Sequence, residues 1–304
     1  MAGRSILSVN RPSPLDVLVR ARQAVRDRMD AAVDRMLGDD VRRRLDEAGA
    51  SAAKRGADPF GLDPEAVRYA VVLAQRLYRD YFRVEVTGIE NVPEGRVLLI
   101  SNHSGQLPFD GMAIATAMLL DHDPPRFVRS MVEKWTAQLP FVSVFFPRVG
   151  QIVGVPENCR FLLEREEPIL VFPEGSRGIS KPFSQRYQLE PFGLGFMRLA
   201  LQTRSPIVPV AVVGAEEQYV SVADLKRLAK LLGMPAFPVM PQLLVPGGFM
   251  PLPVKYRIRF GAPMSFTGDD DDEDAVIEEK VRKVRSTVQS MINLGLKERP
   301  GLFR

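Results

Sequence analysis

The chain has 304 residues, of which 45% are hydrophobic and 26% charged, a balance typical of a globular protein with a substantial core. Its net charge of +4 suits anionic membrane surfaces or phosphorylated ligands, but it is too small for a nucleic-acid-binding protein. One cysteine and two histidines argue against a disulfide framework, a thiolate metal site and a histidine zinc site, so we expect no bound metal.

No segment has the pattern of a secretory signal or of a membrane-spanning helix. The first nine residues lack both a basic start and a long apolar run. The longest run without charge includes residues 234–253 and is broken there by prolines, which a spanning helix does not accommodate at such density. If the protein meets a membrane, we expect it to lie on the surface.

The first part of the chain, residues 1–82, has the pattern of a helical region ahead of a separate domain. Residues 1–11 are expected to be disordered. From Pro14 to about Glu47, apolar residues recur at helical spacing, which predicts one long amphipathic helix or two helices broken near Gly38. We expect this region to pack on the domain or on a partner chain, and the alternative is a basic helix lying on lipid.

A linker and a further helix complete this region. Residues 48–64 are small and interrupted by Gly and Pro, as linkers are. Pro64 then opens a helix that is predicted to continue to about Phe82. The following domain is expected to span residues 83–304.

Short apolar runs alternate with helical patterns through this domain, which indicates an α/β fold. Strands are predicted at 84–86, 97–100, 127–131, 168–172, 207–213 and 255–260. Helices are predicted at 111–121, 156–166, 193–202 and 275–296, the last preceded by an acidic run that complements the helix dipole.

The turn after the second predicted strand contains one of the two histidines. The buried run Val97 to Ile100 ends in this turn and a helix follows it, which is where open α/β sheets place their active sites. His103 is a candidate general base, and Asp110 is the candidate that orients its ring. A turn histidine without a catalytic role and an aspartate that caps a helix are the alternatives.

A second polar turn follows the strand at 168–172. Glu174 and Arg177 lie beside Gly175 and Gly178, which let backbone approach a ligand closely, and arginine presents a fork of donors suited to phosphate. The turn and the nearby Lys181 therefore indicate a site for a phosphate-bearing ligand, or a solvated surface ion pair.

Four blocks in this order resemble the glycerolipid acyltransferases of the lysophosphatidic acid acyltransferase superfamily. They are Asn102-His103 with the downstream aspartate, residues 172–177 (Phe-Pro-Glu-Gly-Ser-Arg), the strand at 206–210 (Pro-Ile-Val-Pro-Val), and residues 146–152 (Phe-Pro-Arg-Val-Gly-Gln-Ile). The resemblance covers about residues 83–265. It implies a single acyltransferase domain with a central mixed, mostly parallel sheet flanked by helices.

The resemblance also implies a reaction, in which an acyl group moves from acyl-CoA or acyl carrier protein to a hydroxyl of a glycerolipid such as 1-acylglycerol-3-phosphate. His103 would act as general base, oriented by Asp110. The residues that would bind the acceptor are Glu174, Gly175, Ser176, Arg177 and Lys181, with Arg148 assisting. We expect no cofactor and no nucleic-acid partner, and a cytoplasmic protein bound peripherally to the cytoplasmic face of the membrane.

One block departs from the family pattern. The spacing here is His103-x6-Asp110, two residues longer than the usual box, and we expect Gly105 and Pro108 to bulge the loop so that Asp110 still reaches the histidine. This spacing looks closer to a divergent branch linked to neutral-lipid synthesis, so diacylglycerol or a long-chain alcohol is an alternative acceptor.

Two apolar segments are candidates for contact with lipid. Residues 135–146 would line an acyl tunnel or face the membrane, although we expect core or a covering loop there. Residues 234–253 are expected to form an exposed apolar loop. Cys159 lies in a helical pattern among apolar residues, so we interpret it as a core residue and not a nucleophile.

Two other functions remain open. A catalytically silent lipid-binding protein would keep the fold while the longer loop separates His103 from Asp110. A hydrolase that releases acyl groups to water ranks last, since the chain lacks a Gly-x-Ser-x-Gly elbow.

Overall fold

The computed structural model describes residues 14–104, 106–231 and 238–303. The expected disorder of residues 1–11 lies outside these ranges. No helix within them is long and apolar enough to cross a membrane.

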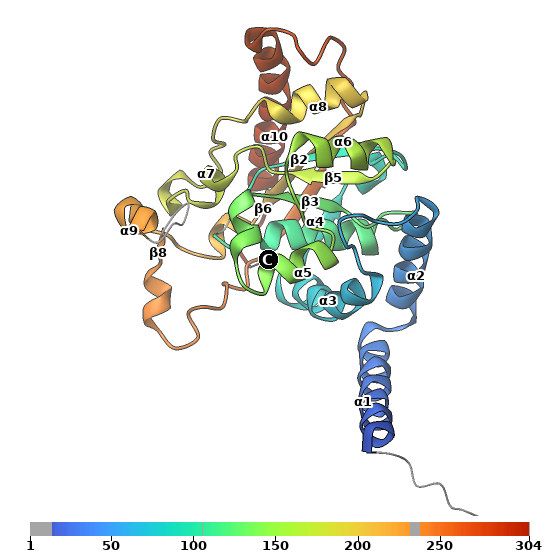
Figure 1. Cartoon of the computed structure of the whole chain (residues 1–304). Helices are drawn as coiled ribbons and strands as arrows, with labels where there is room; N and C mark the ends of the chain where they lie inside the picture. The colour runs from blue at the N-terminus through green and yellow to red at the C-terminus, as the bar shows by residue number, and fades with distance from the viewer. Residues whose placement is uncertain (1–13, 105, 232–237, 304) are drawn as a thin grey trace, which may run out of the picture.

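A seven-stranded sheet forms the centre of the molecule, in the order β1-β9-β6-β2-β5-β3-β4 (Figure 1). All neighbouring strands are parallel except β6 and β9, which confirms the mixed, mostly parallel sheet. The strands are β1 (Glu85–Thr87), β2 (Val97–Ser101), β3 (Arg129–Val132), β4 (Ile152–Val153), β5 (Pro168–Val171), β6 (Ile207–Val213) and β9 (Arg257–Phe260). A separate antiparallel pair joins β7 (Ala223–Asp224) to β8 (Pro238–Val239).

Helices cover both faces of the sheet. They are α1 (Pro14–Leu37), α2 (Asp39–Lys54), α3 (Pro64–Arg76, continued by a π-helical turn over Leu77–Tyr81), α4 (Phe109–Leu120), α5 (Val142–Arg148), α6 (Pro156–Glu164), α7 (Ser176–Ile179), α8 (Gly195–Thr203), α9 (Lys226–Leu231) and α10 (Asp274–Glu298). The predicted strands and longer helices of residues 83–304 agree with these bounds to within about two residues. The short elements α5, α7, α9, β4, β7 and β8 are too brief to show a period.

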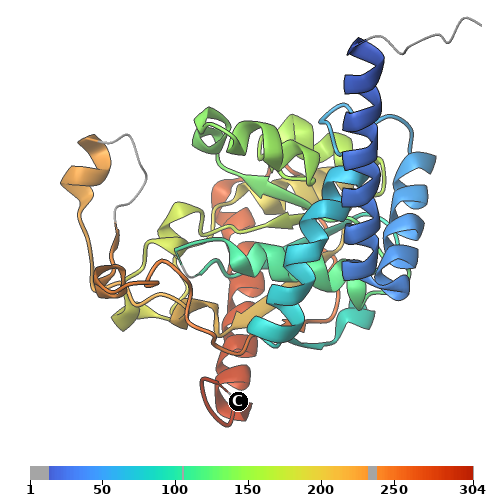
Figure 2. The same cartoon turned by 90° about the horizontal axis from the view of Figure 1, so that it is seen from below.

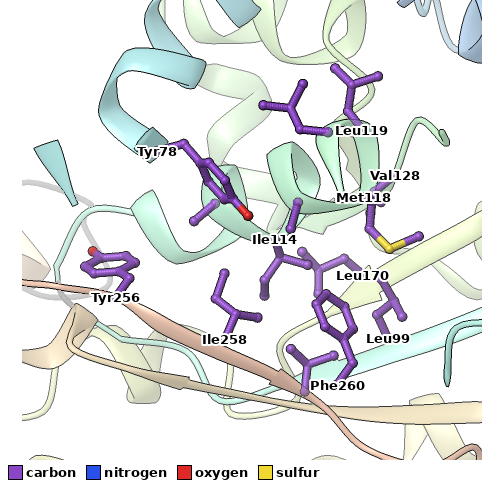
Figure 3. Close-up of a cluster of buried hydrophobic side chains, with 14 of the residues drawn as sticks. Tyr78, Leu99, Ile114, Met118, Leu119, Val128, Leu170, Tyr256, Ile258 and Phe260 are labelled. Carbon is purple, nitrogen blue, oxygen red and sulfur yellow. The ribbon is translucent and has the colours of Figure 1, made fainter. Parts of the chain in front are cut away.

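The central strands carry two cores because their side chains alternate between faces. Leu99 packs with α2, α3 and α4 on one face, in a cluster that also contains Tyr78, Met118 and Leu170 (Figure 3). Leu98 packs with α6, α8 and α10 on the other face. Strands β2 and β6 are buried along their whole length, which explains their continuous runs of branched apolar residues.

The N-terminal region forms two helices that meet at Gly38, where φ is +78°, so the pair is confirmed over the single long helix. Figure 2 shows α1 lying beside α3, and Arg68 of α3 contacts Asp30 and Asp34 of α1. The linker prediction is wrong for residues 48–54, which continue α2, because alanine favours helix and Ala48 is buried in the core. The boundary at 82/83 stays a prediction, and the first core continues across it.

The apolar run 135–146 lies on the surface, so of the two expected placements, core and covering loop, the core placement is wrong. Phe141 is 88% exposed and Val144 65% exposed. The segment forms a 3-10 helix over Lys134–Gln138 and the short helix α5, in which no residue is buried and which ends one residue after Pro147. The expected exposed loop is confirmed for its described part, residues 238–253, where Leu244 is 87% exposed; residues 234–237 lie outside the described ranges.

Phe82 joins the N-terminal helices to the sheet, and its replacement tests that junction. The side chain is fully buried and stacks on Tyr256 with ring centroids 4.4 Å apart. We expect Phe82→Ala to lower the free energy of unfolding by about 3–5 kcal/mol in urea titrations, because it leaves a cavity. Leu73→Ala, on the same helical segment but 63% exposed, is the control and should cost less than about 1 kcal/mol. Equal losses in the two variants would contradict a shared core.

Candidate active site

Four acidic or basic side chains follow the four adjacent parallel strands at the centre of the sheet. Glu216 follows β6, His103 follows β2, Glu174 follows β5 and Glu133 follows β3. Because parallel strands end at the same edge, the loops that carry these residues meet there, at the usual place of an α/β active site. The two polar turns identified in the sequence are thus neighbours in space.

His103 and Asp110 form a hydrogen-bonded pair. The distance from His103 Nδ1 to Asp110 Oδ2 is 2.9 Å, and the side chain of Asp110 is fully buried. The same carboxylate accepts hydrogen bonds from the backbone N–H groups of Ser104, at 2.9 Å, and Gly111, at 2.8 Å. The carboxylate is therefore fixed, and it fixes the imidazole ring in turn, with Nε2 as the nitrogen that faces away from it.

The longer loop does not separate the pair. Pro108 directly precedes α4 and Asp110 lies in the first turn of that helix, so the aspartate is not its N-cap residue. Gly105, expected to help bulge the loop, lies outside the described residues. The contact with Asp110 argues against the catalytically silent alternative, which depends on a broken pair.

Asn102 and Phe172, which belong to two of the four sequence blocks, fix the position of the histidine turn. The amide of Asn102 is fully buried; it donates to the carbonyl oxygen of Val212 at 3.0 Å and accepts from the N–H of the same residue at 2.8 Å. The ring of Phe172 stacks on the ring of His103 with centroids 4.0 Å apart. The turn is thus tied to β6 on one side and to the end of β5 on the other.

Glu174 connects the histidine turn to a buried ionic network. Its Oε1 accepts from the N–H of His103 at 3.0 Å, and its Oε2 accepts from the N–H of Glu190 at 2.7 Å and from Lys181 Nζ at 3.3 Å. Lys181 also donates to Glu216 at 3.3 Å. The sequence predicts Glu174 and Lys181 as acceptor-binding residues, whereas the structure buries both in a network that supports the histidine turn.

The glycines of the second turn allow close packing against the histidine. Gly175 has φ of +61°, and a Cβ atom on Gly178 would lie 2.9 Å from the carbonyl oxygen of His103, so only glycine fits there. Between them, the N–H of Ser176 donates to the carboxylate of Glu133 at 2.7 Å.

The two predicted arginines lie in different places. Arg177 is exposed on the second turn, where its Nη2 donates to the carbonyl oxygen of Pro191 at 2.9 Å. Arg148, at the end of α5, forms an ion pair with Asp63 at 2.6 Å, and this hydrogen bond holds the pKa of Asp63 below its ordinary value. Within the described part of the chain, no contact joins Arg148 to the turns around His103.

Glu133 and Glu216 were not identified from the sequence. Each directly follows, or lies close to, the end of a central strand, and that position is the signal that would have found them.

Cys159 is buried, and burial raises the pKa of its thiol to about 11, which confirms a core residue. No group of three acidic, histidine or cysteine side chains suited to a metal ion occurs among the described residues.

Comparison with known proteins identifies relatives of the chain. A family model described as Acyltransferase matches residues 83–213. An uncharacterized protein of Mycobacterium tuberculosis is 38% identical over 255 residues, covering 81% of this chain and 71% of that protein. A chicken (Gallus gallus) protein named DGAT1/2-independent enzyme synthesizing storage lipids is 25% identical over 210 residues, covering 68% of this chain and 58% of that protein.

A solved structure shares the fold. It is the crystal structure of the 1-acyl-sn-glycerophosphate (LPA) acyltransferase PlsC from Thermotoga maritima, with a TM-score of 0.50 and 18% sequence identity. The match covers 78% of this chain and 80% of that chain.

Glu216 makes the stability of the network depend on pH. Burial raises the pKa of Glu216 from 4.5 to about 7, against the opposing effect of Lys181. Between about pH 4.5 and pH 7 the folded protein keeps the Glu216 carboxyl protonated, whereas the unfolded chain has released the proton. The resulting contribution to the free energy of unfolding is full below about pH 4.5 and is lost as pH rises to about 7.

Glutamine does not titrate, so Glu216→Gln should not lose this contribution. We therefore expect the variant to become more stable relative to the parent as pH rises from 4.5 to 8. The shift should be up to about 3 kcal/mol. Urea titrations of both proteins across this range measure it, and a difference independent of pH would contradict the raised pKa.

Proposed function

Because the chain belongs to the acyltransferase family, we propose that it transfers a fatty acyl group from an acyl thioester to a hydroxyl of a glycerolipid, with His103 as general base. The observation that carries this proposal is the contact of His103 Nδ1 with the fully buried Asp110 at 2.9 Å. A neutral imidazole that donates from Nδ1 to a carboxylate presents Nε2 as an acceptor for a proton.

The reaction proceeds through attack of the acceptor oxygen on the thioester carbonyl carbon. His103 Nε2 takes the hydroxyl proton as the new C–O bond forms, and the C–S bond then breaks. The imidazolium returns the proton to the sulfur of the leaving group, so the products are an ester and a free thiol. Histidine is suited to both steps because its ordinary pKa lies near neutral pH.

Asp110 orients the imidazole and stabilises its protonated form. Two backbone hydrogen bonds to the carboxylate keep it in place, and its burial strengthens the attraction to the imidazolium. The route needs no covalent acyl-enzyme, since the thioester itself is an activated acyl donor. We propose acyl-CoA or acyl carrier protein as that donor, with no further cofactor.

An apolar pocket of about 190 Å³ beside the site is a candidate entrance for the acyl chain. Its lining includes Val132, Val142 and Phe146, and Val132 directly precedes Glu133 at the end of β3. One wall of the pocket comes from the exposed α5 segment, so a chain could enter from an apolar surface.

Exposed apolar residues around the site support binding to a membrane surface. Gln218 joins the histidine turn to the loop at 238–253. Its side-chain Nε2 donates to the carbonyl oxygen of Leu107 at 3.0 Å, and its backbone carbonyl oxygen accepts from the N–H of Leu252 at 2.8 Å. Leu107 is 47% exposed and Phe249 of the same loop 69% exposed. We propose that this apolar rim contacts the cytoplasmic face of a membrane, where the lipid acceptor lies.

The names of two similar proteins point to different classes of lipid. PlsC acts on 1-acyl-sn-glycerophosphate, which bears a phosphate, whereas the chicken relative is named for storage lipids, which are uncharged. A glycerolipid hydroxyl with or without a neighbouring phosphate is compatible with the His103–Asp110 pair as general base.

Replacing either member of the pair tests the mechanism. We expect His103→Ala to abolish acyl transfer and Asp110→Asn to lower kcat by roughly 10²–10⁴-fold, because the base is removed or misoriented. Transfer from labelled acyl-CoA or acyl carrier protein to a panel of phosphate-bearing and uncharged glycerolipids in mixed micelles measures it.

Asp46→Asn, at an exposed carboxylate on α2, is the matched control and should keep the parent activity. Far-ultraviolet circular dichroism verifies that each variant is folded. Transfer that survives in folded His103→Ala would contradict the mechanism, and a parent inactive with every pair of substrates would contradict the function.

Replacing two exposed apolar residues of the loop at 238–253 tests membrane binding. We expect Phe249→Ser combined with Met250→Ser to weaken binding to phospholipid vesicles by about tenfold or more, because two apolar side chains no longer enter the lipid. Val276→Ser combined with Leu294→Ser, on the exposed side of α10, is the matched control. Vesicle flotation measures both, and equal flotation of the two double variants would contradict the proposed contact.

A further inference from the structure

Glu133 places a carboxylate on the second turn of the site. Its Oε1 accepts from the N–H of Ser176 at 2.7 Å and would lie 3.2 Å from a Cβ atom on Gly175. Its Oε2 accepts from Trp135 Nε1 at 3.0 Å. These two hydrogen bonds fix the direction of an otherwise exposed side chain.

This carboxylate belongs to the surroundings of the catalytic pair. Gly175 and Gly178 are joined by a backbone hydrogen bond of 3.0 Å, and a Cβ atom on Gly178 would lie 3.1 Å from Cβ of His103. The segment that packs against the general base is therefore the segment that holds Glu133. An acceptor whose hydroxyl reaches His103 has its neighbouring polar atoms close to this segment.

The groups that would attract a phosphate at this edge are largely engaged. Lys181 is buried between Glu174 and Glu216, and Arg148 is paired with Asp63. Arg177 is exposed on the second turn, where its Nη2 donates to the carbonyl oxygen of Pro191. The N–H of Ser176, the kind of donor that phosphate oxygens use, already donates to Glu133.

A negative charge on the acceptor would meet the Glu133 carboxylate. Like charges within a few ångströms repel, and the repulsion is stronger beside a partly buried site than in water. An uncharged glycerol group meets no such penalty, because its hydroxyls donate hydrogen bonds to a carboxylate. Discrimination against one ligand class by a placed charge is a common source of specificity.

We propose that Glu133 is a specificity-determining residue that rejects anionic acceptors, so that the site takes uncharged glycerolipids of the mono- or diacylglycerol class. This inference rests on the proposed acyl transfer by His103. It adds a residue outside the four sequence blocks and selects one of the two acceptor classes.

The test compares acceptors in the parent and in Glu133→Gln, using the full chain, labelled acyl thioester and micelles of an uncharged detergent. The substitution removes the charge and keeps an oxygen that can accept from Ser176. In the parent, we expect kcat/KM for monoacylglycerol to exceed that for lysophosphatidic acid by tenfold or more. In Glu133→Gln, we expect kcat/KM for lysophosphatidic acid to rise about tenfold, with less than a threefold change for monoacylglycerol.

Glu278→Gln, at an exposed carboxylate on α10, makes the same change in net charge and should leave the ratio of the two acceptors unchanged. A parent that prefers lysophosphatidic acid, or a ratio that Glu133→Gln does not alter, would overturn the role of Glu133 while acyl transfer itself stands. Absence of transfer to every acceptor would instead overturn the proposed function beneath it.

Discussion

The parallel register of β6, β2, β5 and β3 is the constraint on which the site depends. It brings four loops to one edge of the sheet, and the residues that matter come from those loops: Glu216, His103, Glu174 and Glu133. Their strands are buried and continuous with two hydrophobic cores, so the loops start from fixed points. A rigid sheet therefore holds a polar site whose own segments are short.

The charged residues at this edge of the sheet fall into two groups: buried, paired residues that support the histidine turn, and residues that face solvent. Glu174 and Lys181 satisfy each other in the interior, and Glu174 uses its other oxygen to hold the backbone of His103. A buried carboxylate and ammonium are stable only when paired in this way. The side chains left facing solvent at this edge include Arg177 and Glu133, and Glu133 is the one proposed to select the acceptor.

The sequence was sufficient for the strands, the longer helices and the His103–Asp110 pair, because buried strands have a clear apolar pattern and the polar turns follow them directly. It was insufficient where tertiary packing decides the outcome. Residues 48–54 look like a linker but bury Ala48. The apolar pattern of residues 135–146 fits core or a covering loop, and the folded chain places the segment on the surface. Lys181 looks like a ligand-binding cation, and only the folded chain shows the two carboxylates around it.

The most direct test of the proposed mechanism is the protonation state of the His103 ring, measured by nitrogen-15 NMR of the full chain. The chain contains only two histidines, so the signals of the His103 ring can be assigned by comparison with His103→Ala. The mechanism predicts that neutral His103 carries its proton on Nδ1, hydrogen-bonded to Asp110, and that Asp110→Asn shifts this signal. A neutral ring protonated on Nε2, with no response to Asp110→Asn, would contradict His103 as the general base.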